Sequence, residues 1–357
     1  MGIVHRYTLT TFLRNLGYTI VGSLVLFTVM DLLDHISSFT DNEATTSMVA
    51  RYYLYKSAWI IDTVLPIALL MATLFTVGSL ARYLELTALF AAGWSLLQVS
   101  RPLLTVALVA TLFSVVWREY ILPEANLRRE RVWEVEIHRH PDRIRPTQHI
   151  AVRGPDDRIY MARRYDPNTG LLTGLRIVTR EGSRVVERVD AKRAEWDGSN
   201  WTLIEGTRRV FDGDTEVVTP FERLVAADLE IKPQSFYSSR ISREDMNIRQ
   251  LMAYGELVRQ TGGDPTETEV DIHFNLAWPL VNMIVVFMGL VLASGPRKAN
   301  LASGFGMTLL VSFGYYMLMN FGRALGHSGA VPPWLAGWGG NGVYVLLSMV
   351  LFVRARR

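Results

Sequence analysis

Long apolar runs flank one polar, strand-like segment in the middle of the chain. A membrane-spanning helix needs about 20 largely apolar residues to cross the hydrocarbon core. Windows that meet or nearly meet this requirement lie at about 17–36, 57–81, 102–121, 274–294, 301–325 and 335–353. Residues 3–16 have the pattern of a short amphipathic helix at the membrane interface. The pattern therefore predicts a membrane α-helical protein with six transmembrane helices, three on each side of the polar segment.

The polar segment has the pattern of a β-domain. Short β-rich runs, such as Arg158–Arg164, Leu175–Arg180 and Val185–Val189, alternate with Gly, Asp and Asn turn signals. Strands at this spacing favour an antiparallel sandwich or an open barrel. Ser242 to Gln260 carries a helical apolar stripe and leads back to the fourth span. We expect an N-terminal membrane half over 1–121, an all-β domain ending in a helix over 122–271, and a C-terminal membrane half over 272–357.

The distribution of Lys and Arg in the short loops sets the expected orientation, because basic loops stay in the cytoplasm. One side of the membrane would hold Arg6, Arg14, Arg82, Arg101, Arg297, Lys298, Arg354, Arg356 and Arg357. The short loops on the other side hold Arg51 and Lys56. Both termini are therefore expected in the cytoplasm, and the β-domain on the opposite side.

Composition narrows the chemistry further. The chain has 357 residues and a net charge of +3, which gives no case for a nucleic-acid partner. It has no cysteine, which excludes disulfides, thiolate metal sites and cysteine nucleophiles. His138 and His140 are spaced for one face of a strand, but no third ligand is in view, and no Ser/His/Asp arrangement can be argued. We expect no catalytic residue, no metal and no cofactor.

The stretch between the second and third spans, from Arg82 to Gln98, has an amphipathic pattern. The residues at helical spacing are Leu86, Leu89, Phe90, Gly93 and Leu97. They predict a short helix over about 84–97. Small residues around Gly93 would let another surface approach closely. The helix either rests on the membrane interface or docks into a groove of a cytoplasmic motor as a coupling helix.

Here the sequence resembles a known family. Glu85-Leu-Thr-Ala-Leu-Phe-Ala-Ala-Gly-Trp-Ser95 is similar to the signature of the lipopolysaccharide-export permeases LptF/LptG (YjgP/YjgQ). Segments that agree in order are Leu65-Pro66, Pro123, Tyr160–Asp166, Ala194–Gly198, Gly314–Tyr316, Asn320–Arg323 and Val331–Ala336. The resemblance covers essentially the whole chain, and the polar start of the chain and the Glu85 motif favour the G-type subunit.

The resemblance implies a fold, partners and a function. The β-domain would be a periplasmic jellyroll, and the chain would pair with a second permease of the family, as a heterodimer, on an LptB-like ATPase dimer. With an LptC-like jellyroll partner, the complex would extract lipopolysaccharide from the outer leaflet of the bacterial inner membrane. The chain has no Gly-x4-Gly-Lys-[Ser/Thr] motif, so ATP hydrolysis would belong to the separate subunit.

The same resemblance assigns roles to residues of the coupling helix. The helix would carry the ATPase stroke to the spans, and Glu85 would face a basic group of the ATPase. The ATPase-coupling residues would be Glu85, Leu86, Leu89, Phe90, Gly93 and Leu97.

Charged residues near the spans supply the candidate substrate contacts, since a charge in hydrocarbon is costly. Arg323 would offer a forked contact to a lipid A phosphate, or would snorkel and fix the depth of the fifth span. Arg51 and Lys56 would meet headgroup phosphates or remain solvated. Tyr316 would pack in the span or contact the lipid. Asp62 should have a partner on a packed helix.

Asp31 and Asp34 do not suit a phosphate-binding surface and put the span-one part of the substrate contact in doubt. The competing function is a membrane-anchored β-domain that scaffolds or senses envelope components without transport. Binding to an ATPase would separate the two readings.

Overall fold

A computed structural model places the chain in two compact units. It describes residues 2–138, 147–154, 158–166, 169–181, 184–198, 200–212, 215–226, 229, 231, 243–260, 264–294 and 301–355. One unit comprises Met1–Arg129 and Glu269–Arg357, and the other comprises Glu130–Thr268. The first is helical and the second holds the sheet, so a β-domain is inserted between two helical halves.

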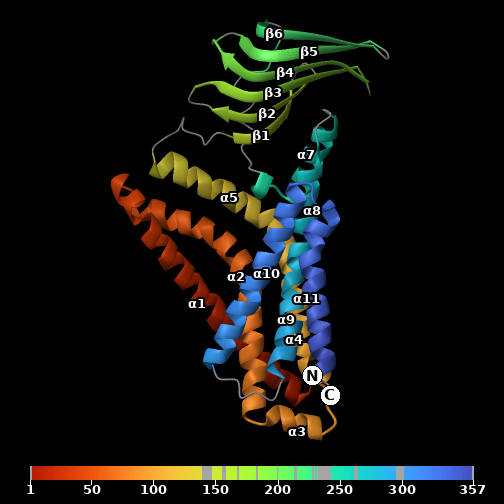
Figure 1. Ribbon diagram of the computed structural model, residues 1–357. Coiled ribbons are helices and arrows are strands. Elements are labelled where there is room, and N and C mark those ends of the chain that lie inside the picture. The colour runs from red at the N-terminus through yellow and green to blue at the C-terminus, as the bar shows by residue number, and fades with distance from the viewer. Residues whose placement is uncertain are drawn as a thin grey trace. The chain divides into compact units, whose positions relative to one another are not determined.

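Long helices make up the first unit. They are α1 (Ile3–Asp41), α2 (Thr46–Arg82), α4 (Leu96–Val116), α8 (Thr266–Ala277), α9 (Val281–Ala293), α10 (Leu301–His327) and α11 (Pro333–Ala355). The short helix α3 (Glu85–Ala91) joins α2 to α4. Figure 1 shows α3 and both ends of the chain at the same end of these helices.

Five helical segments of the described residues are long and apolar enough to cross a membrane. They are Ile3–Asp41, Thr46–Arg82, Leu96–Ile137, Thr266–Ala293 and Pro333–Arg354. The remaining predicted span is α10, whose 27 residues give a length of about 40 Å at 1.5 Å per residue. The membrane-helical architecture with an inserted sheet is therefore confirmed.

Two helices differ from their expected limits. The interfacial helix over 3–16 is not separate, because α1 continues from Ile3 to Asp41 without a break. The third span continues past 121 through η1 (Trp117–Ile121), α5 (Leu122–Arg131) and η2 (Val132–Ile137). Both η segments are wider π-helical turns, and such turns often accommodate an irregularity inside a long helix. Polar residues such as Arg128 and Glu124, which pair with each other along its surface, place this extension outside the apolar window that the sequence predicted.

Helix α9 lies in the centre of the helical unit and packs against α2, α4 and α11. Small residues permit this packing, as is usual between helices in a membrane. A Cβ added at Gly289 would lie 2.9 Å from Leu70 Cδ1, so α9 and α2 approach closely there. Asn282 of α9 donates to Ser114 Oγ of α4 at 2.8 Å, which adds a buried polar link.

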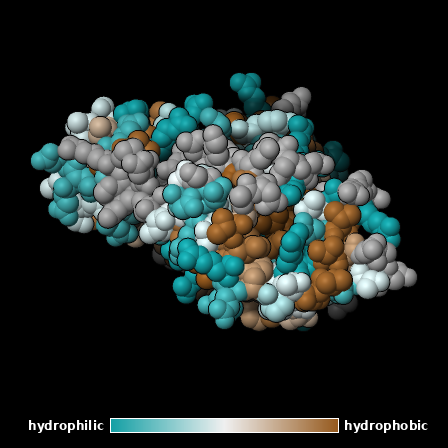
Figure 2. All heavy atoms as spheres, turned by 90° about the horizontal axis from the view of Figure 1, so that it is seen from above, coloured by the Kyte–Doolittle hydropathy of each residue, from teal (hydrophilic) through white to brown (hydrophobic). Residues whose placement is uncertain are grey.

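Apolar side chains also cover the outside of the helices. The most apolar 18-residue stretch of α1 has no buried residue. Figure 2 shows brown hydrophobic side chains gathered in bands between teal hydrophilic ones. In a soluble protein such surface would be a liability, whereas in a membrane it faces lipid or other helices.

The second unit contains one antiparallel six-stranded sheet. Its strands are β1 (Thr147–Arg153), β2 (Ile159–Asp166), β3 (Leu171–Glu181), β4 (Arg184–Trp196), β5 (Trp201–Asp212) and β6 (Thr215–Ala226). They pair in sequence order, so the sheet is an up-and-down meander. A jellyroll proper has Greek-key connections, so the described strands form a simpler sheet than the expected jellyroll. The short helix η3 (Arg243–Asp245) and α7 (Ile248–Gln260) follow the sheet, as the sequence predicted for the end of this domain.

One row of the sheet breaks the alternation of its side chains. Arg163, Gly174, Lys192 and Glu205 occupy the positions where the regular pairing of neighbouring strands is interrupted. Gly174 and Glu205 have positive φ angles of 65° and 51°. On either side of the row, residues three apart are both buried, for example Leu172 and Leu175 on β3. We call this row the crease. At the crease the alternation of buried and exposed positions shifts by one residue, and it does so at the same level in neighbouring strands.

Candidate functional site

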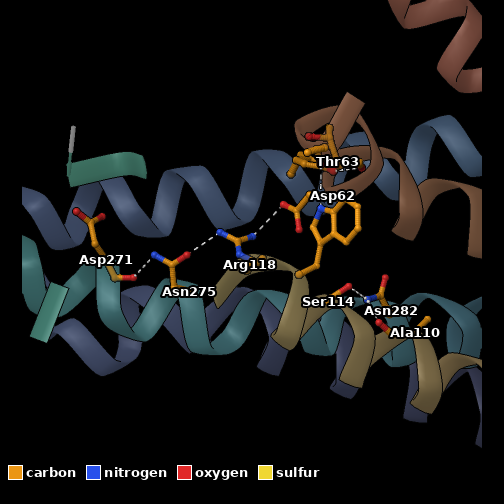
Figure 3. Close-up of polar contacts among 11 residues, drawn as sticks. Asp62, Thr63, Ala110, Ser114, Arg118, Asp271, Asn275 and Asn282 are labelled. Carbon is orange, nitrogen blue, oxygen red and sulfur yellow. Dashed lines mark hydrogen bonds and ion pairs between the residues drawn. The ribbon is translucent and has the colours of Figure 1, made fainter. Parts of the chain in front are cut away.

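A chain of polar contacts crosses the helical unit between α2, η1 and α8. Arg118 of η1 donates from Nη1 to Asp62 Oδ2 at 3.2 Å and from Nη2 to Asn275 Oδ1 at 2.7 Å (Figure 3). Its guanidinium also lies 5.3 Å from the ring centroid of Trp278. Asp62 thus has the partner on a packed helix that its sequence context predicted. The carboxylate and the guanidinium neutralise each other where either charge alone would be costly.

The chain of contacts continues to α10 through Asp271. Asn275 donates to the main-chain oxygen of Asp271 at 2.9 Å. The Asp271 side chain is 1 % exposed, and its Oδ1 accepts from Arg323 Nε at 2.8 Å and from His327 Nε2 at 2.9 Å. Arg323 also lies over the ring of Phe274. Arg323, predicted as a phosphate contact, is therefore ion-paired with a buried carboxylate.

These contacts connect four separate elements, namely α2, η1, α8 and α10. Arg118, Asp271, Asn275 and His327 were not among the candidate residues, although Arg118 falls inside the third predicted span. A charge inside a span indicates a polar partner by itself, so Arg118 could have been found from the sequence. The identity of its partners depends on helix packing and could not.

A second ion pair joins α1 to α2. Lys56 contacts Asp31, and Tyr53 donates to Asp31 Oδ2 at 3.1 Å. Asp31, which does not suit a phosphate-binding surface, is thus the ion-pair partner of Lys56, a candidate phosphate contact. Arg51 lies in the first turns of α2 and its side chain is exposed.

Tyrosines and an asparagine fix α10 to its neighbours. The Tyr316 hydroxyl donates to Thr63 O of α2 at 2.5 Å. This carbonyl lies one turn before Pro66, where a proline ring disturbs the helical hydrogen bonds. On the other side of α10, the Tyr315 hydroxyl donates to Asn341 of α11, and Asn341 donates to Ala277 O at 2.8 Å. The hydroxyl of Tyr316 is therefore engaged within the protein.

The helix predicted over 84–97 is shorter than expected. It begins at Glu85 and ends at Ala91. Gly93 has a φ of 87°, which ends the helix, and Ser95 and Gln98 form a capping box that begins α4. Leu97 consequently belongs to α4. A Cβ added at Gly93 would meet no atom within 4 Å, so close packing within the chain does not require a glycine there. The positive φ angle does.

The side chains of this segment divide between the core and the surface. We call Leu84 to Gln98 the α3 corner. Leu86 is 3 % exposed and lies in the core of the helical unit, with Leu89 packed against it. Phe90 and Leu97 are exposed. Leu84 is also exposed and holds a φ of 61°, an uncommon conformation for a leucine.

The described residues contain no group of three His, Asp or Glu side chains that could hold a metal ion. His138 ends the helical segment at η2, whereas His140 lies outside the described residues, as do Arg297, Lys298, Arg356 and Arg357.

Comparison with known families identifies the chain. The family model described as "Lipopolysaccharide export system permease LptF/LptG" matches residues 6–354, which include both helical halves and the sheet. No curated protein matches the chain. The match agrees with the apolar helices and the inserted β-domain. The chain therefore belongs to the LptF/LptG family of lipopolysaccharide export permeases and is a multi-pass inner-membrane protein that acts with other components of that export system.

Proposed function

We propose that this chain is a permease subunit of an ATP-driven transporter that extracts lipopolysaccharide from the outer leaflet of the inner membrane. It would pass the lipid to a periplasmic β-jellyroll bridge. The family match over residues 6–354 carries the proposal. In this arrangement the chain pairs with a second permease of the family, an LptB-like ATPase dimer and an LptC-like partner.

The α3 corner is the proposed docking surface for the ATPase. It lies at the same end of the helices as both termini (Figure 1), the end that basic residues assign to the cytoplasm. Phe90 and Leu97 are its exposed apolar contacts, and Glu85 at the start of α3 supplies a negative charge for a basic partner. Leu86 and Leu89 would transmit movement instead, because they face the core of the permease.

The outer faces of α1 and α10 are the proposed surfaces for acyl chains. Exposed apolar residues recur at helical spacing on α1, at Val21, Val25, Val29, Leu33 and Ile36. The matching stripe on α10 comprises Phe305, Leu309, Phe313, Met317 and Phe321. Each buried methylene favours binding by about 0.8 kcal/mol, so a lipid with several chains would gain strongly from such stripes.

Arg323, Lys56 and Arg51 are the proposed contacts for the phosphates of the lipid. Arg323 and Lys56 are each paired with an aspartate, so a phosphate would have to compete with Asp271 or Asp31. A phosphate competes well because it offers several charged oxygens to one guanidinium. Tyr316 would position α10 beside this site, because its hydroxyl is bonded to Thr63.

The proposed direction of transport ends in the β-domain, on the periplasmic side. The buried face of its sheet is apolar, with Ile150, Ala162, Leu175 and Ala191 aligned across neighbouring strands. An apolar interior of this kind suits acyl chains better than water does.

Co-purification and transport test the proposal together. The chain, its partner permease and the ATPase would be purified in detergent, reconstituted with lipopolysaccharide, and assayed for ATP-dependent release to a soluble acceptor. We expect Phe90→Asp with Leu97→Asp to abolish ATPase binding, because both side chains are exposed and lie at the corner. Ser37→Asp at the far end of α1 is the matched control and should leave binding unchanged. A wild-type chain that binds no ATPase would favour the scaffold or sensor function instead.

Photocrosslinking tests the phosphate contacts. A photoreactive residue at Phe321, two positions from Arg323, should capture lipopolysaccharide, whereas one at Val115 on the exposed face of α4 should not. Capture at Phe321 should fall in an Arg323→Ala background. Equal capture at both positions would remove the case for a specific contact.

A further inference from the structure

The start of α1 holds the α3 corner from one side. His5 Nε2 donates to Gln98 O at 2.9 Å, and its ring lies edge-on to Trp94 with centroids 5.4 Å apart. The Tyr7 hydroxyl lies 3.5 Å from Glu85 Oε1, a weak donor contact. The first two turns of α1 therefore touch the first residue of α3 and residues beyond its end, although 93 positions separate His5 from Gln98.

A proline explains why Gln98 needs an outside donor. In an α-helix the carbonyl of residue 98 accepts from the N–H of residue 102. Residue 102 is Pro102, which has no N–H. The Gln98 carbonyl therefore lacks its helical partner, and His5 supplies the missing donor. The bond therefore joins the first turns of α1 to the start of α4 at a carbonyl that the helix itself leaves open.

The contact continues along α1 towards the membrane. Phe12 is fully buried in the same core as Leu86, with Leu89 and Trp94 packed against it. Asn15 donates to Thr76 Oγ1 of α2 at 3.0 Å. Because α1 is one unbroken helix from Ile3 to Asp41, a movement of its first turns reaches its exposed apolar stripe without a hinge.

We infer that the first turns of α1 form a clasp on the α3 corner and that this clasp carries movement of α3 directly into α1. The inference rests on the proposed function, in which α3 receives the ATPase and α1 borders the lipid. His5 is the positioning residue of the clasp, because it joins both Gln98 and Trp94. Without the clasp, movement of α3 would reach the lipid only through α2 and α4, the helices that continue it in the chain.

Lipid release per ATP hydrolysed tests the clasp in the complete reconstituted transporter. The loss of one hydrogen bond worth about 1 kcal/mol corresponds to about a fivefold change. We expect His5→Ala to lower lipid release per ATP by about fivefold while ATPase binding and ATP hydrolysis persist. His5→Phe keeps a ring against Trp94 but removes the donor, and it should give an intermediate loss. Thr10→Ala is the matched control, because Thr10 is exposed on the same helix and bonds to Arg6 O within it.

A covalent rescue separates this role from a loss of folding. The chain has no cysteine, so His5→Cys with Trp94→Cys gives a unique pair for a short bis-maleimide linker. The double variant should be uncoupled before linking and should regain wild-type lipid release per ATP after linking. A misfolded variant would not recover.

The outcomes distinguish the two proposals. If the wild-type complex releases no lipopolysaccharide with ATP, the proposed function fails. If the wild type transports and the His5 variants couple as well as the wild type, the proposed function stands and the clasp is wrong. A double variant that remains uncoupled after verified linking would also overturn the clasp.

Discussion

Asp271 is the carboxylate on which two cationic or titratable side chains of α10 converge. Replacing it by asparagine keeps the shape but removes the charge that Arg323 and His327 share. We expect Asp271→Asn to lower the free energy of unfolding by about 2 kcal/mol or more, because the remaining partners are only partly solvated. Thermal unfolding in detergent would measure the change. Asp41→Asn, at an exposed site on α1, should change it by less than about 0.5 kcal/mol.

Asp190 in the sheet makes stability depend on pH. Burial favours the neutral carboxyl, but hydrogen bonds from Arg188 and Arg176 and their charges outweigh it and hold the pKa of Asp190 below its ordinary value. A carboxyl with a lowered folded pKa contributes stability at neutral pH that is lost as pH falls below its unfolded pKa. Unfolding followed by the fluorescence of the β-domain tryptophans should therefore show a loss of stability at acid pH. That loss should be smaller in Asp190→Asn than in the wild type. An unchanged pH profile in that variant would contradict the assignment.

The sequence identifies charged residues more readily than it identifies their partners. Arg323 and Lys56 were recognised as cations beside the membrane, yet their pairing with Asp271 and Asp31 depends on how α10 and α2 pack. Asp31 does not suit a phosphate-binding surface, and its ion pair with Lys56 explains why an acidic residue stands at this position. A phosphate role for these cations stays a prediction.

At the scale of helices, close packing of α11 on α8 depends on Gly337. A Cβ there would lie 2.6 Å from His273 Cβ and 2.8 Å from Phe274 N, so the helices would have to separate. We expect Gly337→Ala to destabilise the helical unit by about 1–3 kcal/mol. Gly342 lies on the same helix with no atom within 4 Å of an added Cβ.

Gly342→Ala is thus the matched control for Gly337. It should be neutral or stabilise by up to about 1 kcal/mol through helix propensity. Thermal unfolding of both variants in the same detergent makes the comparison. Similar melting temperatures would show that α11 does not depend on close contact with α8.

Helices were easier to predict than their limits. Hydropathy located the apolar centres of the spans but not the ends of the helices, because polar ends such as Leu122–Arg131 remain helical without being apolar. The helix over 84–97 was too long because a helical repeat cannot show that Gly93 turns to positive φ. The strands were found from turn residues, whereas their register was hidden by the crease, where the alternation of buried and exposed positions shifts.

At the scale of the whole molecule, the proposed topology predicts opposite accessibility for α3 and the sheet. The cysteine-free chain allows a single cysteine at Thr87 on α3 or at Thr219 on β6, both exposed. A membrane-impermeant maleimide added to cells with a permeabilised outer membrane should label the Thr219→Cys chain. The Thr87→Cys chain should react only after the inner membrane is opened. Labelling of both before that point would reject cytoplasmic placement of α3.

The crease in the sheet limits how this domain can change in evolution. Loops between its strands can grow or shrink without moving any side chain between the two faces. Deleting one residue within a strand on one side of the crease would instead put the shift in that strand's alternation out of line with the shifts in the neighbouring strands. Leu172, Ala194 and Leu203, which are aligned across three strands, would then no longer share a face. Length variation in related domains should therefore be confined to the turns, while the strands keep a fixed count on either side of Gly174 and Glu205.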